Sequence, residues 1–413
     1  MADIDTEAVK TLARDTKLGK PLILHISGDF PDPLDAAKTP VIRRLVDLTA
    51  NSFEHHVVSI NRTSSSMLDV AKTIVAPGPL RIESQSFEYG EVVRYSAPPH
   101  GLRHRTKLLQ LGQWVAGFID RLPRRPAFII GHKLTIEGIV AHETARLTGI
   151  PYGLSIQGNT DLKILAARRD LKSSFAEIFH QSRAVFPFAP WALQQTEARI
   201  GQRSGPTHLL PCATELDTPI APRAGGDGLV SVFHLHNYRG KNLAGMVEAL
   251  RLLRARRSNV PKLEIVGGGS ERDLVACRQI ASGVPEIRFV GPCDRDAVRQ
   301  RLHRASALVL PSIRESFGLV FIEALFAGTP IIYPAGTAID GYFDDADFAL
   351  SVNARSAVSI ADAIERAVDN EAAMKLALSD WQQSDDAGRF SRERIAQVFS
   401  SGLEKAMSNR PAP

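Results

Sequence analysis

Short apolar runs bounded by glycine or proline alternate with longer amphipathic segments along most of the chain, in two successive series. The short runs predict buried strands and the longer segments predict helices, which is the pattern of βα units feeding a mostly parallel sheet. At 413 residues the chain is long enough for two or three domains. The pattern therefore predicts two α/β domains in succession.

The first series predicts strands at Pro21–Ser27, His56–Ile60, Phe128–Ile130, Tyr152–Ile156 and Ala184–Phe188. Its predicted helices are Thr39–Ala50, Lys107–Arg121, Ile136–Thr148 and Asp161–His180. The second series predicts strands at Leu229–Leu235, Lys262–Val266, Ile287–Val290, Ala307–Leu310 and Pro330–Tyr333, with helices between them.

A polar, turn-rich stretch at about 210–228 separates the two series and predicts a hinge. We expect a first domain over residues 1–215 and a second over 216–389. A helix over about 390–413, with Ile395, Val398 and Phe399 on its apolar face, is expected to pack back on the first domain. Two such domains would place a ligand cleft at the carboxyl ends of their strands.

Composition excludes several classes of protein. Hydrophobic residues make up 44% of the chain and charged residues 23%, as in soluble globular proteins. The cysteines, Cys212, Cys277 and Cys293, show no Cys-x-x-Cys spacing, which argues against a disulfide framework or a zinc site. Residues 1–20 lack the apolar centre of a secretory signal, and no stretch approaches the roughly 20 apolar residues that span a bilayer. We expect a cytoplasmic protein, with peripheral attachment to the inner face of the cell membrane as an open alternative.

The segment from Pro311 to Ile332 carries the most chemical information. It predicts a strand end, a glycine turn, a helix, and a Gly-Pro stop before another strand. The amides of Phe317, Gly318 and Leu319 would point out of the helix N-terminus, where a phosphate is favoured. Glu323, farther along, can accept hydrogen bonds from two neighbouring hydroxyls. A diphosphate flanked by sugar diols would suit this arrangement.

Seven residues separate Glu315 from Glu323, and the flanking Ser-Phe-Gly and Glu-Ala-Leu-x-x-Gly-x-Pro complete a pattern. The segment resembles the E-x7-E signature of retaining glycosyltransferases of family 4. Those enzymes share the GT-B fold of two facing Rossmann-like domains with parallel sheets and an interdomain cleft. The resemblance implies that Glu315 contacts the donor sugar and Glu323 the nucleoside ribose; the alternative is a solvated helix face. It is strong from about 228 to 400 and weaker before that.

Lys241 matches the family's lysine at the start of a helix. Two cations there would neutralise the charge that grows on a departing diphosphate. The family's arginine normally stands five or six positions before the lysine, whereas Arg239 stands two before. Whether Arg239 or another residue replaces it is left open. Gly267, in a strand-end glycine turn, is a donor-binding candidate by resemblance, with an ordinary turn as the alternative.

In the first half the resemblance is weaker. Gln157 stands where the family has a histidine that faces the donor sugar, and an amide cannot titrate as an imidazole does. Gly28 stands where a doubled glycine is common and is followed by Asp29. We take Gly28 and Gln157 as donor-side candidates and His132 as an acceptor-side candidate, each with a structural turn as the alternative.

A basic, partly apolar stretch from Leu102 to Val115 is followed by Arg121, Arg124 and Arg125. It suits either a core helix with solvated cations or a helix lying on an anionic membrane surface with Trp114 at the interface. Net charge is only +5 and no nucleic-acid-binding motif accompanies the cations, so a nucleic-acid partner is not expected.

Together with the resemblance, these observations predict a glycosyltransferase that moves a hexosyl unit from a nucleotide diphosphate sugar to a hydroxyl acceptor. The resemblance implies that the anomeric configuration is retained. By family analogy the acceptor is a glycan or lipid-linked molecule in bacterial surface or exopolysaccharide assembly. The sequence shows no metal-ligand pattern, so we expect no cofactor or metal. A nucleotide-sugar epimerase on the same fold and a degenerate, non-catalytic GT-B scaffold remain as alternatives.

Overall fold

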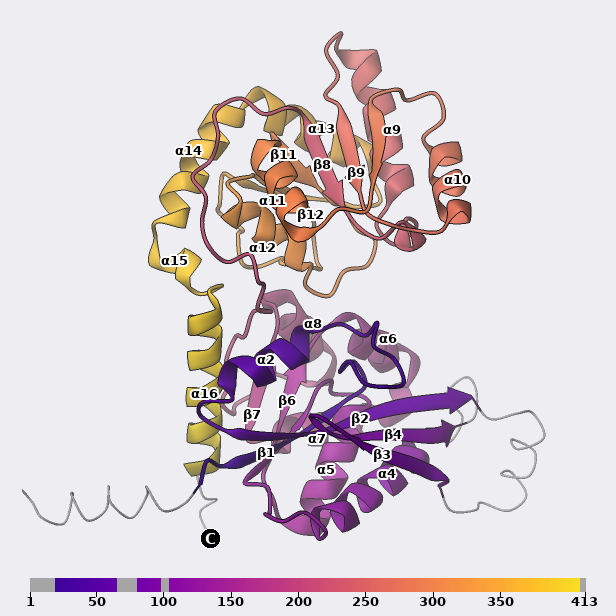
Figure 1. The fold of residues 1–413 in the computed structure, drawn as a ribbon, viewed down its shortest axis with the longest axis vertical. Helices are drawn as coiled ribbons and strands as arrows, with labels where there is room; N and C mark the ends of the chain where they lie inside the picture. The colour runs from indigo at the N-terminus through magenta and orange to yellow at the C-terminus, as the bar shows by residue number, and fades with distance from the viewer. Residues whose placement is uncertain (1–18, 65–79, 98–103, 409–413) are drawn as a thin grey trace, which may run out of the picture. The chain divides into compact units, whose positions relative to one another are not determined.

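The computed structural model describes residues 19–64, 80–97 and 104–408 (Figure 1). Residues 1–18 and the start of the basic stretch, Leu102 and Arg103, lie outside these ranges. Contacts group the chain up to Ser155, Glu177–Val185 and the chain from Phe399 onward into unit 1. Ile156–Ala176 and Phe186–Val398 form unit 2. The predicted domain limits near 215–216 and 389–390 stay predictions.

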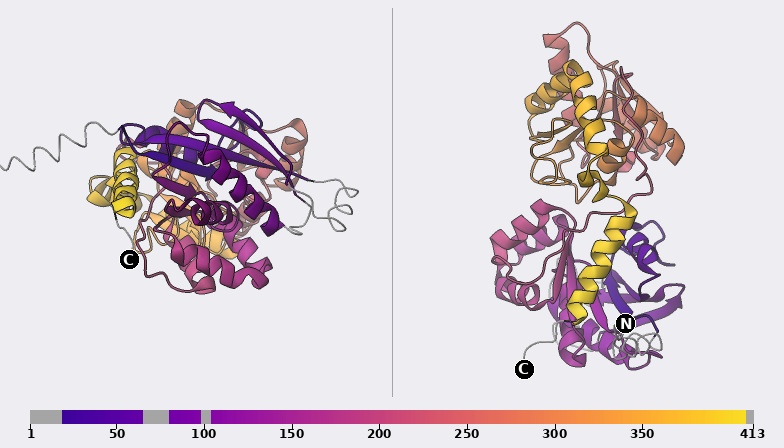
Figure 2. Two further views of the ribbon diagram at one scale, coloured as in Figure 1. Left: turned by 90° about the horizontal axis from the view of Figure 1, so that it is seen from below. Right: turned by 90° about the vertical axis from the view of Figure 1, so that its left-hand side faces the viewer.

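The first sheet has seven strands in the order β3-β4-β2-β1-β5-β6-β7. Its strands are β1 (Leu22–Ser27), β2 (Glu54–Ser64), β3 (Ile82–Phe87), β4 (Gly90–Ala97), β5 (Phe128–Gly131), β6 (Tyr152–Ile156) and β7 (Ala184–Pro187). β1 pairs in parallel with β2 and β5, β2 with β4, and β5 with β6. β3 pairs antiparallel with β4, so the expected parallel sheet has one exception at its edge. Figure 2 gives two further views of the ribbon.

The helices in this part of the chain are α2 (Val41–Thr49), α4 (His104–Ile119), α5 (Glu137–Thr148), α6 (Asn159–Ala167), α7 (Lys172–Gln181) and α8 (Pro190–Ile200). The prediction of one helix over Asp161–His180 is wrong, because α6 ends at Ala167 and a short 3-10 turn, η2 (Arg169–Leu171), precedes α7. Arg168 lies at φ −113° and ψ 61°, outside the helical region, and its guanidinium pairs with Asp170.

The second sheet has six strands in the order β10-β9-β8-β11-β12-β13, and each recorded pairing is parallel. The strands are β8 (Leu229–Val232), β9 (Leu263–Val266), β10 (Ile287–Gly291), β11 (Ala307–Val309), β12 (Ile331–Pro334) and β13 (Ala349–Val352). They are short and mostly buried, as expected for strands covered by crossover helices. The predicted fold class, two Rossmann-like α/β units, is confirmed.

The helical elements of this half are η3 (Leu235–Asn237), α9 (Leu243–Arg256), α10 (Glu271–Ile280), α11 (Arg295–Arg304), α12 (Leu319–Phe326), α13 (Ala357–Asp369), α14 (Glu371–Gln382), α15 (Asp385–Gly388) and α16 (Arg392–Ser408). α9 packs against α13, while α11 contacts α12 and β8. The carboxyl ends of β8, β9 and β11 lead into the segments that carry the predicted donor residues. In open α/β sheets this edge is where ligands bind.

Candidate functional site

Lys241 and Glu315 contact each other through an ammonium–carboxylate pair. Their side chains are only 21% and 14% exposed, so solvent screens the pair weakly. Asn242, at φ 62°, caps α9 by accepting a hydrogen bond from the Gly245 amide. Its side-chain amide also donates to the carbonyl of Pro311 at 3.0 Å, at the end of β11. Asn242 therefore fixes the backbone from which Lys241 reaches Glu315.

Glu315 lies in the loop between β11 and α12. Its backbone carbonyl accepts hydrogen bonds from the Thr337 hydroxyl and from the Ala338 amide. Gly318 caps α12 at φ 77°, where a Cβ atom would stand 2.7 Å from the Phe321 ring and 3.1 Å from Cγ of Glu315. A residue with a side chain would thus be strained there and would crowd Glu315.

Phe317 is buried, and Leu319 is the first residue of α12. The first amides of a helix lack intrahelical acceptors, and the helix dipole adds partial positive charge. This terminus follows directly on the loop that holds Glu315, so the structure brings Lys241, Glu315 and the α12 amides together. Lys241 and the α12 amides can bind an anion, and Glu315 can accept hydrogen bonds from hydroxyl groups next to it in the same ligand.

Glu323 lies one helical turn beyond Leu319, on the same face of α12. Its Oε1 accepts a hydrogen bond from the Thr214 hydroxyl at 2.7 Å. Thr214 is fully buried, whereas Glu323 is partly exposed. One carboxylate oxygen is therefore held in place, and the other is left for hydroxyl donors such as a diol.

Arg239 is exposed, and its guanidinium lies 5.1 Å from the centre of the Tyr238 ring. Arg314, beside Glu315, is also exposed. Within the described residues, neither arginine forms an ion pair with Glu315. The role of Arg239 as second cation stays a prediction.

Gly267 follows β9 at φ +152°, and a Cβ there would lie 1.8 Å from the carbonyl oxygen of Phe233. No relaxation of a side chain could relieve a clash with backbone. Glycine is therefore required at 267 because the chain after β8 and the chain after β9 approach each other closely. This requirement does not depend on a bound nucleotide.

Gln157 follows β6 directly and is half-buried. The next residue, Gly158, has φ +96°, and a Cβ there would lie 2.2 Å from the Trp191 ring. Asn159 Nδ2 donates to Oγ of Ser316 at 3.3 Å. Within unit 2 the chain around Gln157 therefore lies beside the loop that carries Glu315.

In unit 1 the Gly28 amide donates to Oε1 of Glu137 at 2.8 Å. The ammonium of Lys133 is 3.5 Å from the same oxygen and 2.5 Å from Oδ2 of Asp29. Glu137 is only 1% exposed, and its burial raises the pKa of its carboxyl to about 7 in spite of Lys133. This cluster lies where β1 and β5 end, so Gly28 is held by a buried charged group that the sequence analysis did not identify.

His132 is buried and takes part in a chain of histidines through unit 1. Its Nε2 is 2.9 Å from Nδ1 of His25, whose Nε2 is 2.9 Å from Nδ1 of His55. On the other side, Nδ1 of His132 is 3.2 Å from the Ser155 hydroxyl. Burial lowers the pKa of His132 to about 3 and of His55 to about 4, and holds that of His25 well below its ordinary value. An acceptor role for His132 stays a prediction.

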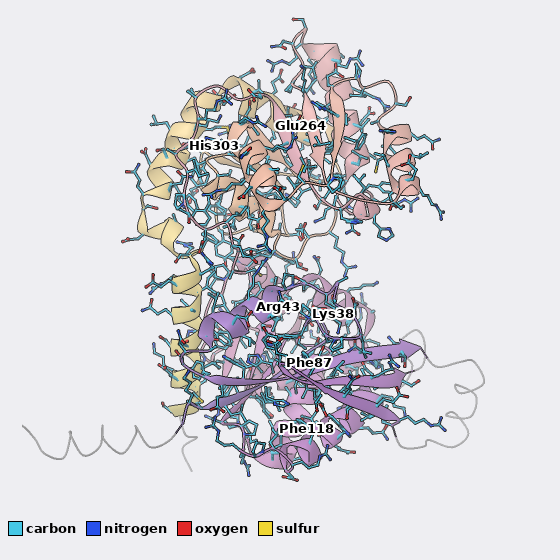
Figure 3. All side chains as sticks on the ribbon, in the orientation of Figure 1. Lys38, Arg43, Phe87, Phe118, Glu264 and His303 are labelled. Carbon is cyan, nitrogen blue, oxygen red and sulfur yellow. The ribbon has the colours of Figure 1, made fainter. Side chains whose placement is uncertain are left out.

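Asp32, in the loop after β1, is buried among donors. The ammonium of Lys38 (labelled in Figure 3), the Ser59 hydroxyl and the Asn61 amide all donate to its Oδ2 at 2.5–2.8 Å. Burial would raise the pKa of Asp32, but these hydrogen bonds outweigh it and lower the pKa to about 2. The group ties the loop after Gly28 to β2.

The apolar face of α4, which includes Leu108, Leu111 and Val115, packs against α5. Trp114 stacks on Phe118 with their ring centres 5.4 Å apart. In the part of the chain that the structure describes, no helix combines the length and apolar character needed to cross a bilayer. Within those same residues, no three His, Cys, Asp or Glu side chains are grouped so as to hold a metal ion.

Solved structures that share this fold include enzymes of the GT-B class. Sucrose-phosphate synthase from Thermosynechococcus elongatus matches with a TM-score of 0.66 at 19% identity, over 94% of this chain and 99% of that one. A structure described as "Trehalose-6-phosphate from E. coli bound with UDP-2-fluoro glucose" matches with a TM-score of 0.63 at 12% identity, over 95% and 100%. The fold is therefore that of the GT-B class.

Residues 226–381 match the family described as "Glycosyl transferases group 1". This region includes Lys241, Gly267, Glu315 and Glu323. The D-inositol 3-phosphate glycosyltransferase of Jonesia denitrificans is 38% identical over 120 residues, which is 27% of this chain and 27% of that protein. The chain thus spans only about a quarter of the length of this curated relative.

Proposed function

We propose that this chain is a glycosyltransferase that moves a hexosyl unit from a nucleotide diphosphate sugar to a hydroxyl acceptor. The observation that carries the proposal is the contact between Lys241 and Glu315 beside the amino end of α12. A cation, a carboxylate and helix amides meet there at the carboxyl edge of a Rossmann-like sheet. The family match over residues 226–381 covers all of these groups.

Lys241 and the α12 amides are suited to stabilise the diphosphate as it leaves. Its negative charge grows as the glycosidic bond breaks, so interactions that strengthen with that charge lower the barrier. Glu315 balances the Lys241 charge, and an anionic donor would compete for the same ammonium. Arg239 is proposed as the second cation.

The two carboxylates are assigned to hydroxyl groups of the donor. Glu315, in the loop, would orient the sugar, and Glu323, held by Thr214, would bind the ribose. Gly28 and Gln157 are proposed on the donor side and His132 on the acceptor side. By family resemblance we propose that the anomeric configuration is retained and that no metal is needed.

For the acceptor we propose a glycan or lipid-linked molecule in the assembly of a bacterial surface polysaccharide. The relatives are named for different transfers, such as D-inositol 3-phosphate glycosyltransferase and sucrose-phosphate synthase. The family match is confined to the second half of the chain. This is what we expect of enzymes that share donor chemistry but differ in their acceptors. The proposed location is the cytoplasm, with α4 as the candidate contact to an anionic membrane.

The test begins with a thermal-shift screen of the full chain against nucleotide diphosphates and their sugar conjugates, since selective ligands raise the unfolding temperature. The best donor is then incubated with and without candidate acceptors in excess chelator, and products are followed by mass spectrometry. We expect sugar transfer, or slow donor hydrolysis without acceptor. An epimerised nucleotide sugar would instead identify an epimerase, and binding without any conversion would identify a scaffold.

A further inference from the structure

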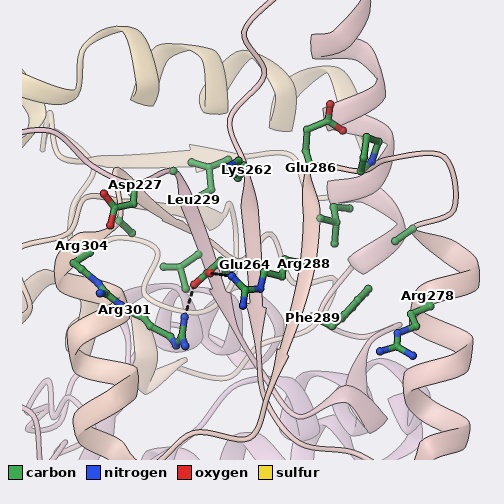
Figure 4. A pocket seen from close by; sticks show the side chains of 16 residues that line it. Asp227, Leu229, Lys262, Glu264, Arg278, Glu286, Arg288, Phe289, Arg301 and Arg304 are labelled. Carbon is green, nitrogen blue, oxygen red and sulfur yellow. Dashed lines mark hydrogen bonds and ion pairs between the residues drawn. The ribbon is translucent and has the colours of Figure 1, made fainter.

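A cavity of about 880 Å³ lies in unit 2, on the second sheet (Figure 4). Leu229, Leu263 and Ile287 are the first residues of β8, β9 and β10, and the cavity is lined from around these positions. Its volume is within the range of small-molecule sites. None of the residues of the proposed donor site lines it.

The order of the strands explains why the sheet is open here. α9 connects β8 to β9, and α10 connects β9 to β10, so both connections move across the sheet in the same direction. Because such crossovers are right-handed, both helices lie on one face of the sheet. The connection through α11 returns to β11, beside β8, on the other face. Among the described residues no helix covers the face of β9 and β10 next to α11, and Figure 4 shows Arg301 and Arg304 of α11 at its border.

The lining carries five cationic and three acidic side chains. Two of the acids pair with cations that do not line the cavity: Asp227 with Arg223 at 3.6 Å, and Glu286 with Arg254 at 3.5 Å. Glu264 is shared by two arginines, Arg301 at 2.7 Å and Arg288 at 3.7 Å. The other lining cations, Lys262, Arg278 and Arg304, have no ion pair within the described residues. The cavity therefore carries an excess of positive charge.

We propose that this cavity binds a hydroxylated phosphate ester, such as a sugar phosphate. Arg301 and Arg304 lie three residues apart on one face of α11, and Arg288 reaches the same carboxylate as Arg301 from β10. Such convergent arginines suit the several oxygens of a phosphate group.

The carboxylates and the floor of the cavity suit the rest of such a ligand. Oε2 of Glu286 is buried and has no hydrogen-bond partner within the described residues, so it can accept from a sugar hydroxyl. Val230 of β8 pairs in register with Glu264, so it lies on the same face of the sheet and supplies an apolar contact for a sugar ring.

This site is separate from the proposed donor site. The cavity lies at the amino ends of β8 to β10, whereas Lys241 and Gly267 follow the carboxyl ends of β8 and β9. Strands of four residues span roughly 13 Å. The inference goes beyond the proposed function, because it assigns a second, effector-type site whose ligand need not take part in transfer.

The test is calorimetric titration of the full chain with ribose 5-phosphate, with unphosphorylated ribose as the matched ligand. We expect saturable binding of the phosphate ester with a Kd below about 1 mM and none of ribose. Arg288→Ala and Arg304→Ala should each weaken binding about tenfold, as expected for loss of a charge-assisted contact. Arg272→Ala, an exposed arginine of α10 outside the cavity, should bind as the unaltered chain does.

Lys241→Ala separates this inference from the proposed function. Binding of ribose 5-phosphate should survive that change even if nucleotide diphosphate binding is lost. Loss of binding in Lys241→Ala but not in Arg304→Ala would place the ligand in the donor site and overturn the inference. Absence of binding up to about 10 mM would also overturn it, as would pelleting with phosphatidylglycerol vesicles in place of binding the soluble ester.

Discussion

The Gly28 amide donates a hydrogen bond to Glu137 across 109 residues of sequence, with 2.8 Å between nitrogen and Oε1. The contact joins the end of β1 to the first residue of α5, just beyond β5. Glu137 makes it while almost completely buried, and its second oxygen, Oε2, has no hydrogen-bond partner within the described residues. An ionised carboxylate in that position is costly to desolvate, and Lys133 offsets only part of the cost.

Glu137→Gln is therefore predicted to stabilise unit 1 at alkaline pH. The pKa of Glu137 rises from an ordinary 4.5 to about 7, so the folded state holds the proton more tightly than the unfolded state. As pH rises from about 4.5 to about 7, the contribution of Glu137 to the free energy of unfolding therefore falls, by up to about 3 kcal/mol at pH 8. Glutamine mimics the protonated form and can still accept from Gly28. Unfolding in urea at pH 5.5 and pH 8 should show a gain that grows with pH.

Glu143→Gln is the matched control on the same helix. Its carboxylate accepts two hydrogen bonds from Arg146, at 2.9 Å each, and these lower the pKa of Glu143. Removing that charge should cost stability at pH 8, which is the opposite sign. An equal loss in both variants would contradict the account of Glu137.

The histidine chain is predicted to make unit 1 sensitive to acid. Neutral His25, His55 and His132 can each donate once and accept once along the chain, but a protonated ring can only donate. Because their folded pKa values lie below the ordinary 6.5, the unfolded state gains protons first as pH falls below 6.5. Each histidine should cost about 2 kcal/mol at pH 5.

Hydrogen exchange of β1 and β5, followed by mass spectrometry from pH 7.5 to pH 5, measures this loss locally. His132→Asn should reduce the slope of stability against pH by close to one proton. His236→Asn alters a histidine whose side chain is 77% exposed and lies outside the buried chain, and it serves as the control. A slope that is the same in both variants would show that the buried chain does not carry the acid response.

The sequence predicted most of this fold because buried parallel strands are short apolar runs. β3 escaped prediction because its sequence, Ile-Glu-Ser-Gln-Ser-Phe, is an exposed edge strand without such a run, and its partner β4 was missed with it. β13 was also missed. The split between α6 and α7 was not visible because neither glycine nor proline marks Arg168.

The residues of the candidate site also fall into those that the sequence could reveal and those that it could not. Glu315, Glu323 and Lys241 could be predicted because local spacing and neighbouring residues carry the signal. Thr214 and Glu137 could not, because each meets its partner only through tertiary packing, 109 residues away in sequence. Asn242 was also missed, although an asparagine directly before a helical run is a readable cap signal.

Thr214→Val is predicted to weaken nucleotide binding without slowing transfer at saturating donor. The substitution keeps the buried shape and removes the hydroxyl that donates to Oε1 of Glu323 and accepts from the Leu216 amide at 3.2 Å. Losing the hydrogen bond to the Glu323 carboxylate should raise the Kd for the best nucleotide diphosphate about tenfold. Thr218→Val, at an exposed position of the same segment, is the calorimetric control. Equal affinity in the two variants would remove the positioning role of Thr214.

Gly267→Ala and Gly268→Ala are predicted to differ sharply. Alanine at 267 would bring its Cβ to 1.8 Å from the carbonyl oxygen of Phe233 at a φ of +152°, so backbone must move. At 268 the nearest atom would be Cβ of Pro292 at 3.5 Å, an ordinary contact. Thermal unfolding should show a loss of more than about 2 kcal/mol for the first variant and less than about 1 kcal/mol for the second. Similar stability of both variants would contradict the stated need for glycine.

Lys241→Ala is predicted to lower kcat for transfer about 100-fold or more, because it removes a cation that acts mainly as charge develops on the leaving diphosphate. The KM for donor should change less than kcat, since Glu323 and the α12 amides are untouched. Arg239→Ala tests the second cation, and a kcat loss of about tenfold is expected if its guanidinium turns from Tyr238 to the diphosphate. Lys172→Ala, at an exposed position of α7, is the control. Full turnover in Lys241→Ala would remove the central role assigned to this residue, because the Lys241–Glu315 contact would then be a structural ion pair only.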